Sequence, residues 1–573
     1  MLKRGFCENK FRSKLVSGTL TMSVAYVLLL SDSVVAGFFI GEKGVAAINA
    51  VSPVTGIVVF LSGIIASGSG ILYSRKIGAM KKDEADKIFG QGLIVSAVIA
   101  LLGSAFFLFG KDIYFNLMGI PNEIYELASA YYIWTPFNVI LEVMLGYLAT
   151  MVYIDGDDIS SNLSNICQIV GNLLFSILLV QKLGMEGIIL GTVIGNATSL
   201  IPTIWHFFRK SNSLHFSWHF SFSDLFHVIR YSVVDSAVYL CWGVADFIMI
   251  GFVSANYGET GLITLSVVFN LIEFNVVLDG VGQAVQPLLG TYMGEDNPVM
   301  IKRLMRSSFF SSLLEGLIAA TLVFILAKPF CGLFGITEGT ALEPSIHAVR
   351  IVAVGILFSG LLTLVTSYYM LIDHVALAVL ITVLDNGILY STLPMLGSIL
   401  FGETGMWVSF MVTPIISLII SFIFVRLYYG KERFPFLLEK SDAEIVVMDD
   451  ILTNDNITKL SERVSDLMLE QNYPEKVAMK AALFIEEIGV TIMDKNKKKN
   501  KKLYVEITMF FERSSLLLIE RDSGIIIDLT DPDIMIEGLS GFILSGLMES
   551  HGEKAYLTTT GYNRNMIRFQ KAE

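Results

Sequence analysis

Charged side chains are scarce in this sequence. Lys, Arg, Asp and Glu make up 16% of its 573 residues, whereas a soluble domain has about 25%. The scarcity is uneven, because long apolar segments fill the chain as far as Gly430 and an ordinary soluble composition follows. We therefore expect two regions, one that faces a membrane and one that faces water.

Further absences exclude particular kinds of chemistry. The net charge of −12 argues against nucleic acid as the main partner, because phosphates bind basic surfaces. The four cysteines are too scattered to form a disulfide framework or a metal motif. His215 and His219 lack nearby acidic or cysteine ligands. No G-x4-G-K-[ST] loop occurs, which argues against a pump driven by ATP through a P-loop.

Twelve apolar segments are each long enough to span a bilayer, which takes roughly 20 mainly apolar residues. They lie near residues 15–40, 45–73, 89–110, 125–153, 159–181, 184–208, 228–254, 261–292, 305–328, 344–372, 375–399 and 404–428. Basic residues gather around the connections after the second, sixth and eighth segments, which marks those loops as cytoplasmic. We expect a multi-pass protein of the bacterial inner membrane with both termini in the cytoplasm.

The two halves of the apolar region resemble each other. Asp32 stands five residues before Gly37 in the first segment, and Asp246 stands five residues before Gly251 in the seventh. A repeat of six spans within twelve is typical of transporters, in which two similar bundles rock about a central site. The predicted domains are an N-terminal bundle, a C-terminal bundle, a linker and a cytosolic domain, over residues 1–220, 221–430, 431–449 and 450–573.

Asp32 lies among apolar residues of the first span, where a carboxylate is costly. Insertion scales place a mid-membrane Asp at about +2.5–3.5 kcal/mol, so such residues usually face a cavity or a partner. Protonation would remove its charge and its attraction for a cation, so that substrate and proton compete for one acid. The alternative is that Asp32 caps or braces a helix near the surface. For Asp246, a matching cavity site and a structural role are equally good interpretations.

The sequence resembles the multidrug and toxic compound extrusion (MATE) transporters over residues 14–430. The shared features are Asp32 before Gly37, the G-A-M-K-K turn at Gly78, the D-G-D turn at Asp155–Asp157, the pair Gly171 and Asn172, and GMEGIILGT ending at Thr192. The resemblance implies a monomer that exports organic cations or drugs in exchange for H+ or Na+. It implies no other cofactor for transport and no catalytic residues.

The resemblance also implies a cation site in the N-terminal bundle. The family places there the first-span Asp, a fifth-span Asn with an Asp one turn later, and a sixth-span Thr. Asp32, Asn172 and Thr192 match these positions, whereas Ser176 stands where the family has its second acid. Of the residues expected at this site, Asp32 alone offers Na+ a carboxylate ligand. Coupling to protons would need no acid other than Asp32.

The residues after 442 predict a strand, two helices, two strands, a Gly-rich helix and closing strands, as in an α/β sandwich. Over residues 450–570 this order resembles the histidine-kinase-like ATPase fold, and most of all the anti-sigma-factor serine kinases. The resemblance assigns to a nucleotide pocket Glu487, Thr491, Asp522, Gly524, Gly538 and Gly541. Thr491 replaces the Asn that holds Mg2+ in that family. The alternatives for this domain are ATP binding with or without Mg2+, kinase activity, binding of a cytosolic regulatory partner, and a degenerate fold without ligand.

Three functions fit the whole sequence. The first is a cation-coupled exporter of small molecules, with a regulatory or nucleotide-sensing cytosolic domain. The second is a flippase for lipid-linked saccharides, which would need a strongly cationic cavity, whereas the central spans carry almost no Lys or Arg. The third is a membrane sensor whose transporter part reports its ligand to the C-terminal domain. The expected fold is an all-α membrane protein of twelve helices in two six-helix bundles with a cytosolic α/β domain.

Overall fold

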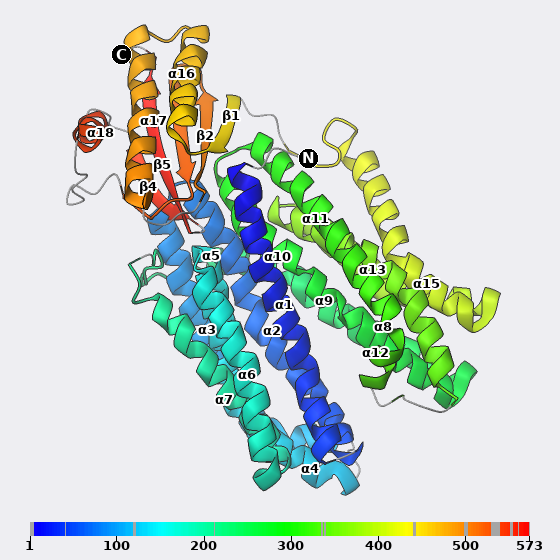
Figure 1. Ribbon diagram of the computed structural model, residues 1–573. Helices are drawn as coiled ribbons and strands as arrows, with labels where there is room; N and C mark the ends of the chain where they lie inside the picture. The colour runs from blue at the N-terminus through cyan, green and yellow to red at the C-terminus, as the bar shows by residue number, and fades with distance from the viewer. Residues whose placement is uncertain are drawn as a thin grey trace.

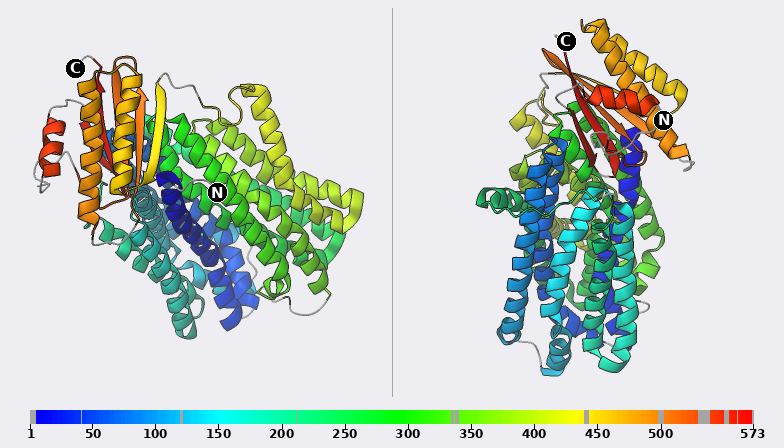
Figure 2. Two further views of the ribbon diagram at one scale, coloured as in Figure 1. Left: turned by 45° about the horizontal axis from the view of Figure 1, so that its top comes forward. Right: turned by 90° about the vertical axis from the view of Figure 1, so that its left-hand side faces the viewer.

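The structure, a computed structural model, consists of two groups of long helices and a smaller α/β domain at the C-terminus (Figure 1). It describes residues 5–40, 42–118, 122–210, 212–333, 336, 340–438, 443–497, 502–528, 539–549, 554–559 and 561–571. We call residues 443–571 the tail domain. The start of the chain and the tail domain lie at the same end of the molecule (Figure 2).

The first helix group contains the helices of the N-terminal half. These are α1 (Phe6–Phe39), α2 (Glu42–Gly78), α3 (Lys82–Met118), α4 (Asn122–Tyr132), α5 (Thr135–Asp155), α6 (Asp158–Leu183) and α7 (Met185–His206). The second helix group follows. It contains α8 (Phe222–Glu273), α9 (Asn275–Leu278), α10 (Gly280–Gly294), α11 (Pro298–Ile325), α12 (Ala327–Leu333), α13 (Leu342–Leu371), α14 (Val375–Thr382), the π-helix η1 (Val383–Leu389) and α15 (Tyr390–Tyr429).

Sequence signals mark the helix ends. Pro136 lies in the first turn of α5, where its missing N–H is not needed. The helix stops at Gly156, whose φ of +96° is costly for residues with a side chain. The side chain of Asp157 then caps α6 by accepting a hydrogen bond from the Ser160 amide at 3.0 Å. These short turns keep α5, α6 and α7 together as neighbours.

Ten stretches of the described residues are long and apolar enough to cross a membrane, and the number twelve remains a prediction. One of the ten, Val375–Tyr429, contains a break at Gly402, where φ is +69°. A similar break occurs in α8 at Gly258, where φ is +61°. Such angles end one helix and begin another, since Gly alone adopts them freely.

The two helix groups repeat the same backbone turns. Positive φ angles recur in matching pairs at Met80 and Asp296, Gly156 and Asp373, and Gly184 and Gly402. The two members of each pair are separated by nearly the same number of residues. The backbone therefore carries the internal repeat that the sequence indicated.

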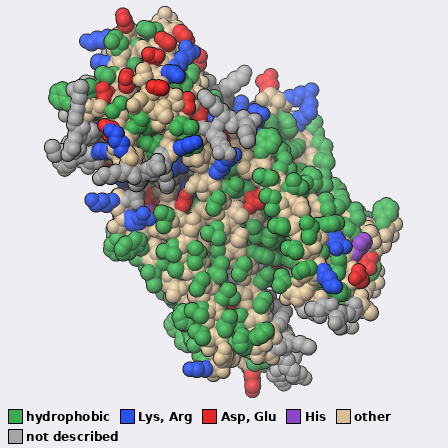
Figure 3. Space-filling view, viewed as in Figure 1, with side chains coloured by type: hydrophobic (Ala, Val, Ile, Leu, Met, Phe, Trp, Pro, Cys, Tyr) green, Lys and Arg blue, Asp and Glu red, His purple; other side chains and the backbone are tan. Residues whose placement is uncertain are grey.

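Side-chain chemistry differs sharply between the helix groups and the tail domain. Apolar side chains are spread over the visible face of the helix groups, while charged ones gather over the tail domain (Figure 3). Large apolar side chains are exposed on the helices, such as Phe109 at 81% and Phe401 at 78%. Such surfaces are expected where lipid is the solvent.

The tail domain is a five-stranded antiparallel sheet with helices on one face. Its elements are β1 (Glu444–Ile451), α16 (Asn454–Glu470), α17 (Glu475–Asn496), β2 (Tyr504–Phe511), β3 (Ser515–Asp522), α18 (Leu539–Glu549), β4 (Lys554–Thr559) and β5 (Tyr562–Gln570), and the strand order is β1-β2-β3-β5-β4. Alternate residues of β2, Val505, Ile507 and Met509, pack with α16 and α17 in one core. The residues between them face the other way, toward the helix groups.

Candidate functional site

Asp32 is buried at the far end of α1 from the tail domain, with 8% of its surface exposed. The Tyr131 hydroxyl of α4 donates to one carboxylate oxygen at 2.6 Å. The Thr192 hydroxyl of α7 donates to the same oxygen at 3.1 Å. The side-chain amide of Asn172, in α6, donates to the other oxygen at 3.3 Å. Four helices therefore converge on one carboxylate.

The structure brings together three of the residues expected at this site. Asn172 and Thr192 contact Asp32 and also contact each other, because the Asn172 amide donates to the Thr192 hydroxyl at 2.7 Å. The Ser31 hydroxyl accompanies them, donating to the Asn172 carbonyl oxygen at 2.9 Å. The hydrogen-bond partners of Asp32 in the described part of the chain are all neutral. We call these residues, with Tyr131, the Asp32 cluster.

Sequence reasoning missed Tyr131. The fourth span, expected over residues 125–153, instead begins at Thr135, and the residues before it form the separate helix α4. This break turns Tyr131 toward Asp32. Pro136 could have signalled the break, because proline is typical of the first turn of a helix. Nothing in the sequence near Tyr131 indicates its partner, which lies 99 residues away.

Ser176 lies close to the Asp32 cluster but has another partner. It is fully buried and donates to the Ile188 carbonyl oxygen of α7 at 3.0 Å. A Cβ on Gly191 would lie 2.2 Å from the Ser176 oxygen, so α6 and α7 pack tightly here. Ser176 therefore joins two helices. The side chain of Asp246, the expected counterpart in the second half, lies outside the described residues.

Polar residues continue along α7 from Thr192 toward the tail domain. Asn196, one turn further, donates to Glu142 at 2.7 Å and to Asn138 at 2.9 Å. Its carbonyl oxygen accepts from Gln168 at 2.8 Å. The stripe then continues through Ser199, Thr203 and His206, which are all buried. Their spacing of three or four residues places them on one face of the helix.

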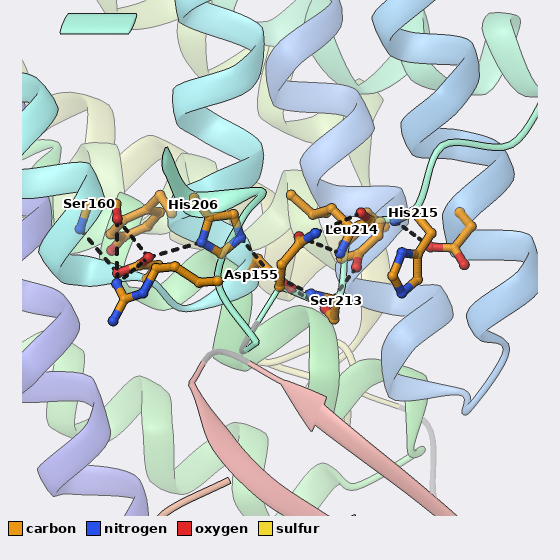
Figure 4. Close-up of polar contacts among 12 residues, drawn as sticks. Asp155, Ser160, His206, Ser213, Leu214 and His215 are labelled. Carbon is orange, nitrogen blue, oxygen red and sulfur yellow. Dashed lines mark hydrogen bonds and ion pairs between the residues drawn. The ribbon is translucent and has the colours of Figure 1, made fainter. Parts of the chain in front are cut away.

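His206 ends this stripe between two acids (Figure 4). Its Nε2 lies 2.8 Å from Asp155 and its Nδ1 lies 2.9 Å from Asp157. Both nitrogens can donate only in the cationic form of the ring. Although burial opposes it, hydrogen bonds from His206 and Ser160 hold the pKa of Asp157 below its usual value. Arg209 adds an ion pair to Asp157 at 2.6 Å, so the turn after α5 is firmly fixed.

The tail residues expected at a nucleotide pocket are partly brought together. Asp522 ends β3, is fully buried, and accepts from the Gly524 amide at 2.6 Å. Gly524 lies against α17, since a Cβ there would be 2.7 Å from Ile492, which follows Thr491. Glu487 is half-buried on the same helix. Gly541 is buried on α18, and Gly538 lies outside the described residues.

This part of the tail domain contains buried oxygens that have no hydrogen-bond partner among the described residues. They are Thr491 Oγ1, Glu520 Oε1, Asp522 Oδ2 and Asn565 Oδ1. Burial raises the pKa of Asp522 to about 6. Burial and the charge of Asp522 together raise the pKa of Glu520. Buried oxygens normally have partners, so this group can accept hydrogen bonds from a donor that enters here.

The helical part has clear relatives. The MatE family model matches residues 19–178 and again residues 232–392, which together exceed half of the chain. The chain belongs to the MatE family. The two matches lie in the first and second helix groups, and both end before the tail domain. No curated protein matches this chain.

Solved structures share the fold of this MatE protein. One is described as the outward-facing conformation of a multidrug resistance MATE family transporter of the MOP superfamily; it has a TM-score of 0.69 and 19% identity, and the match covers 74% of this chain and 96% of that one. Another is a MOP superfamily transporter from Pyrococcus furiosus Vc1 (DSM3638), whose binding pocket is described as having reverse polarity. Its TM-score is 0.67, with 19% identity and the same coverage. The family and the long apolar helices identify a multi-pass membrane transporter rather than an enzyme.

Proposed function

We propose that this MatE protein is a secondary active antiporter that exports organic cations or drugs in exchange for H+ by alternating access. The observation that carries the proposal is the Asp32 cluster, in which one buried carboxylate accepts hydrogen bonds only from neutral side chains among the residues that the structure describes. An ionised Asp32 attracts a cation, and a protonated Asp32 does not. Export and proton uptake are coupled when the two ligands exclude each other at one acid.

The neighbours of Asp32 suit both of its charge states. The hydroxyls of Tyr131 and Thr192 donate to the carboxylate, and each can rotate to accept a hydrogen bond once Asp32 carries a proton. Na+ needs several oxygen ligands instead. Here the Asn172 amide nitrogen points at Asp32, its carbonyl oxygen already accepts from Ser31, and Ser176 bonds elsewhere. The cluster therefore favours H+ over Na+.

A pH gradient supplies the energy for this exchange, because one monovalent cation that leaves for one proton that enters moves no net charge across the membrane. Each unit of pH difference across the membrane is worth about 1.4 kcal/mol. That energy supports a substrate gradient of about ten-fold for each pH unit.

The test is the movement of a fluorescent organic cation in vesicles under an imposed H+ or Na+ gradient. Wild type should move the cation only under the H+ gradient, and Asp32→Asn should lose that movement. Asp112→Asn, an exposed acid of α3, is the matched control and should keep it. Transport driven by Na+ alone would refute H+ coupling, and no transport by wild type under either gradient would refute the antiporter.

We also propose that the tail domain binds a nucleotide as a sensor. The four buried oxygens without partners support this, because the amino group of a base is the kind of donor they lack. Thr491 has neither carboxylate nor carboxamide for Mg2+, so we expect binding that is independent of the metal. ATP titration of the full-length protein, with and without Mg2+, tests this. Asp522→Asn should weaken binding at least ten-fold, and the exposed Asp494→Asn should not. An unchanged affinity in Asp522→Asn would contradict the site.

A further inference from the structure

One side chain of the tail domain contacts both helix groups at once. Arg564 of β5 donates to the carbonyl oxygens of Ile77 at 2.9 Å and Gly78 at 2.7 Å, which end α2 in the first group. The same guanidinium lies 2.8 Å from Glu295, just after α10 in the second group. These contacts can exist together only while the ends of α2 and α10 lie side by side.

A buried ion cluster surrounds this contact. Arg521 of β3, directly opposite Arg564 in the sheet, forms ion pairs with Glu295 and, at 2.7 Å, with Glu506 of β2. All four side chains are at most 1% exposed. We call Glu295, Glu506, Arg521 and Arg564 the Arg–Glu cluster. Its charges balance only when Glu295 of the helix groups meets the three tail residues, since buried charges need partners.

A second contact joins the same three parts of the molecule. Arg303 of α11 forms ion pairs at 2.7 Å with Glu8 of α1 and with Asp449 of β1. It therefore connects the second helix group to the first and to the tail domain. Beside it, the Phe6 ring of α1 packs edge-on against Tyr562 of β5, with ring centroids 5.0 Å apart.

The two helix groups are closed against each other beneath the tail domain. A Cβ on Gly78 would lie 2.5 Å from the Thr291 carbonyl oxygen, and a Cβ on Gly294 would lie 2.4 Å from the Arg75 carbonyl oxygen. The backbones of α2 and α10 therefore touch. Arg75 also forms an ion pair with Asp373 at 2.6 Å. Toward the opposite end the two groups diverge (Figure 1).

We propose that the tail domain is an intramolecular clamp that holds the tail-side ends of the two helix groups together. The basic loops assign this side to the cytoplasm, so the clamp keeps the transporter closed to the cytoplasm. This inference rests on the proposed antiport by alternating access. Substrate enters from the cytoplasm only when α2 and α10 separate, and Arg564 cannot hold Gly78 and Glu295 once they do. Release of the tail domain is therefore a step of the transport cycle, at which transport is regulated.

Distances between two spin labels on the tail side test the clamp. The labels go on cysteines that replace Lys87 of α3 and Arg306 of α11, both exposed, in the full-length protein with its native cysteines replaced. Arg564→Met breaks the Arg–Glu cluster from the tail, and Glu295→Gln breaks it from the helix groups. Arg568→Met is the matched control, because this arginine of β5 pairs with Glu512 inside the tail domain.

The clamp predicts a several-fold larger population at long distance in both cluster variants and no change in the control. Glu295→Gln leaves the tail sequence intact, so its response cannot come from a misfolded tail. A short distance that persists in both variants would overturn the clamp. The labels report without substrate or gradient. An unresponsive pair in a protein that still exports the organic cation therefore contradicts the clamp alone, whereas responsive labels without any export contradict the antiporter.

Discussion

The Asp32 cluster and the Arg–Glu cluster are both buried, but they hold charge in different ways. Asp32 is one acid among neutral donors, so a proton can neutralise it while Tyr131 and Thr192 rotate to suit. In the Arg–Glu cluster two cations meet two anions whenever Glu506 is ionised. Removal of one member there leaves a buried charge unpaired, which costs about 3–5 kcal/mol. The first arrangement suits a group that changes its charge, and the second suits an interface that is either fully formed or separated.

We expect the largest effect from Arg521→Met, which tests whether the Arg–Glu cluster depends on complete charge pairing. Glu295 keeps Arg564, but Glu506 loses its cationic partner inside the tail domain, so we expect docking of the tail to weaken by about 3–5 kcal/mol. Hydrogen exchange of β2 and β3 amides in the full-length protein measures this. Arg568→Met removes a partly exposed pair and should cost less than about 1 kcal/mol. Equal protection in the two variants would show that the cluster contributes no docking energy.

The second largest effect is expected in the pH dependence of the stability of the tail domain. Burial raises the pKa of Glu506 from 4.5 to about 7, although Arg521 opposes the shift. A raised carboxyl pKa means that the folded state binds the proton more tightly, so its contribution to stability is present below pH 4.5 and is lost as the pH rises through 7. We expect a loss of about 3 kcal/mol over that window, since one pKa unit corresponds to about 1.4 kcal/mol. Glu506→Gln should flatten the pH dependence of amide exchange, and an unchanged slope would contradict this origin.

Tyr131→Phe tests the contribution of a neutral hydrogen-bond donor to the Asp32 cluster. It removes the shortest hydrogen bond to the carboxylate, and a hydrogen bond to a charged group contributes about 1.5–3 kcal/mol. We expect the rate of cation export to fall about ten-fold or more. Tyr132→Phe is the matched control, because this neighbouring hydroxyl donates to the Phe107 carbonyl oxygen at 2.9 Å. Similar export rates in the two variants would mean that Tyr131 only supports the fold.

The smallest effect is expected when two partners are removed together. Combining Arg521→Met with Glu506→Met replaces an ion pair by apolar side chains of similar length. Such exchanges are often nearly neutral, so the double variant should lose less than about 1.5 kcal/mol of tail protection, far less than Arg521→Met alone. Additive losses in the hydrogen-exchange measurement would show that the two charges do not act as a pair.

The sequence predicted the Asp32 cluster better than the tail contacts, for a physical reason. Asp32, Asn172 and Thr192 stand out because polar residues are rare in apolar helices. Tyr131 does not, because a tyrosine near a helix end is ordinary. In the tail strands, alternation separates two faces of the sheet. The alternation does not show whether the face that carries Arg521 and Arg564 contacts water or another part of the chain.

The short connection between α15 and the tail domain has a consequence for how tightly the tail binds. Docking is intramolecular, so the helix groups meet the tail at an effective concentration that short linkers set in the millimolar range. An interface with only millimolar affinity would then be about half occupied. The interface between the tail domain and the helix groups can therefore be weak enough to open during each transport cycle. A separate copy of the tail would have to reach millimolar concentration to replace the attached one.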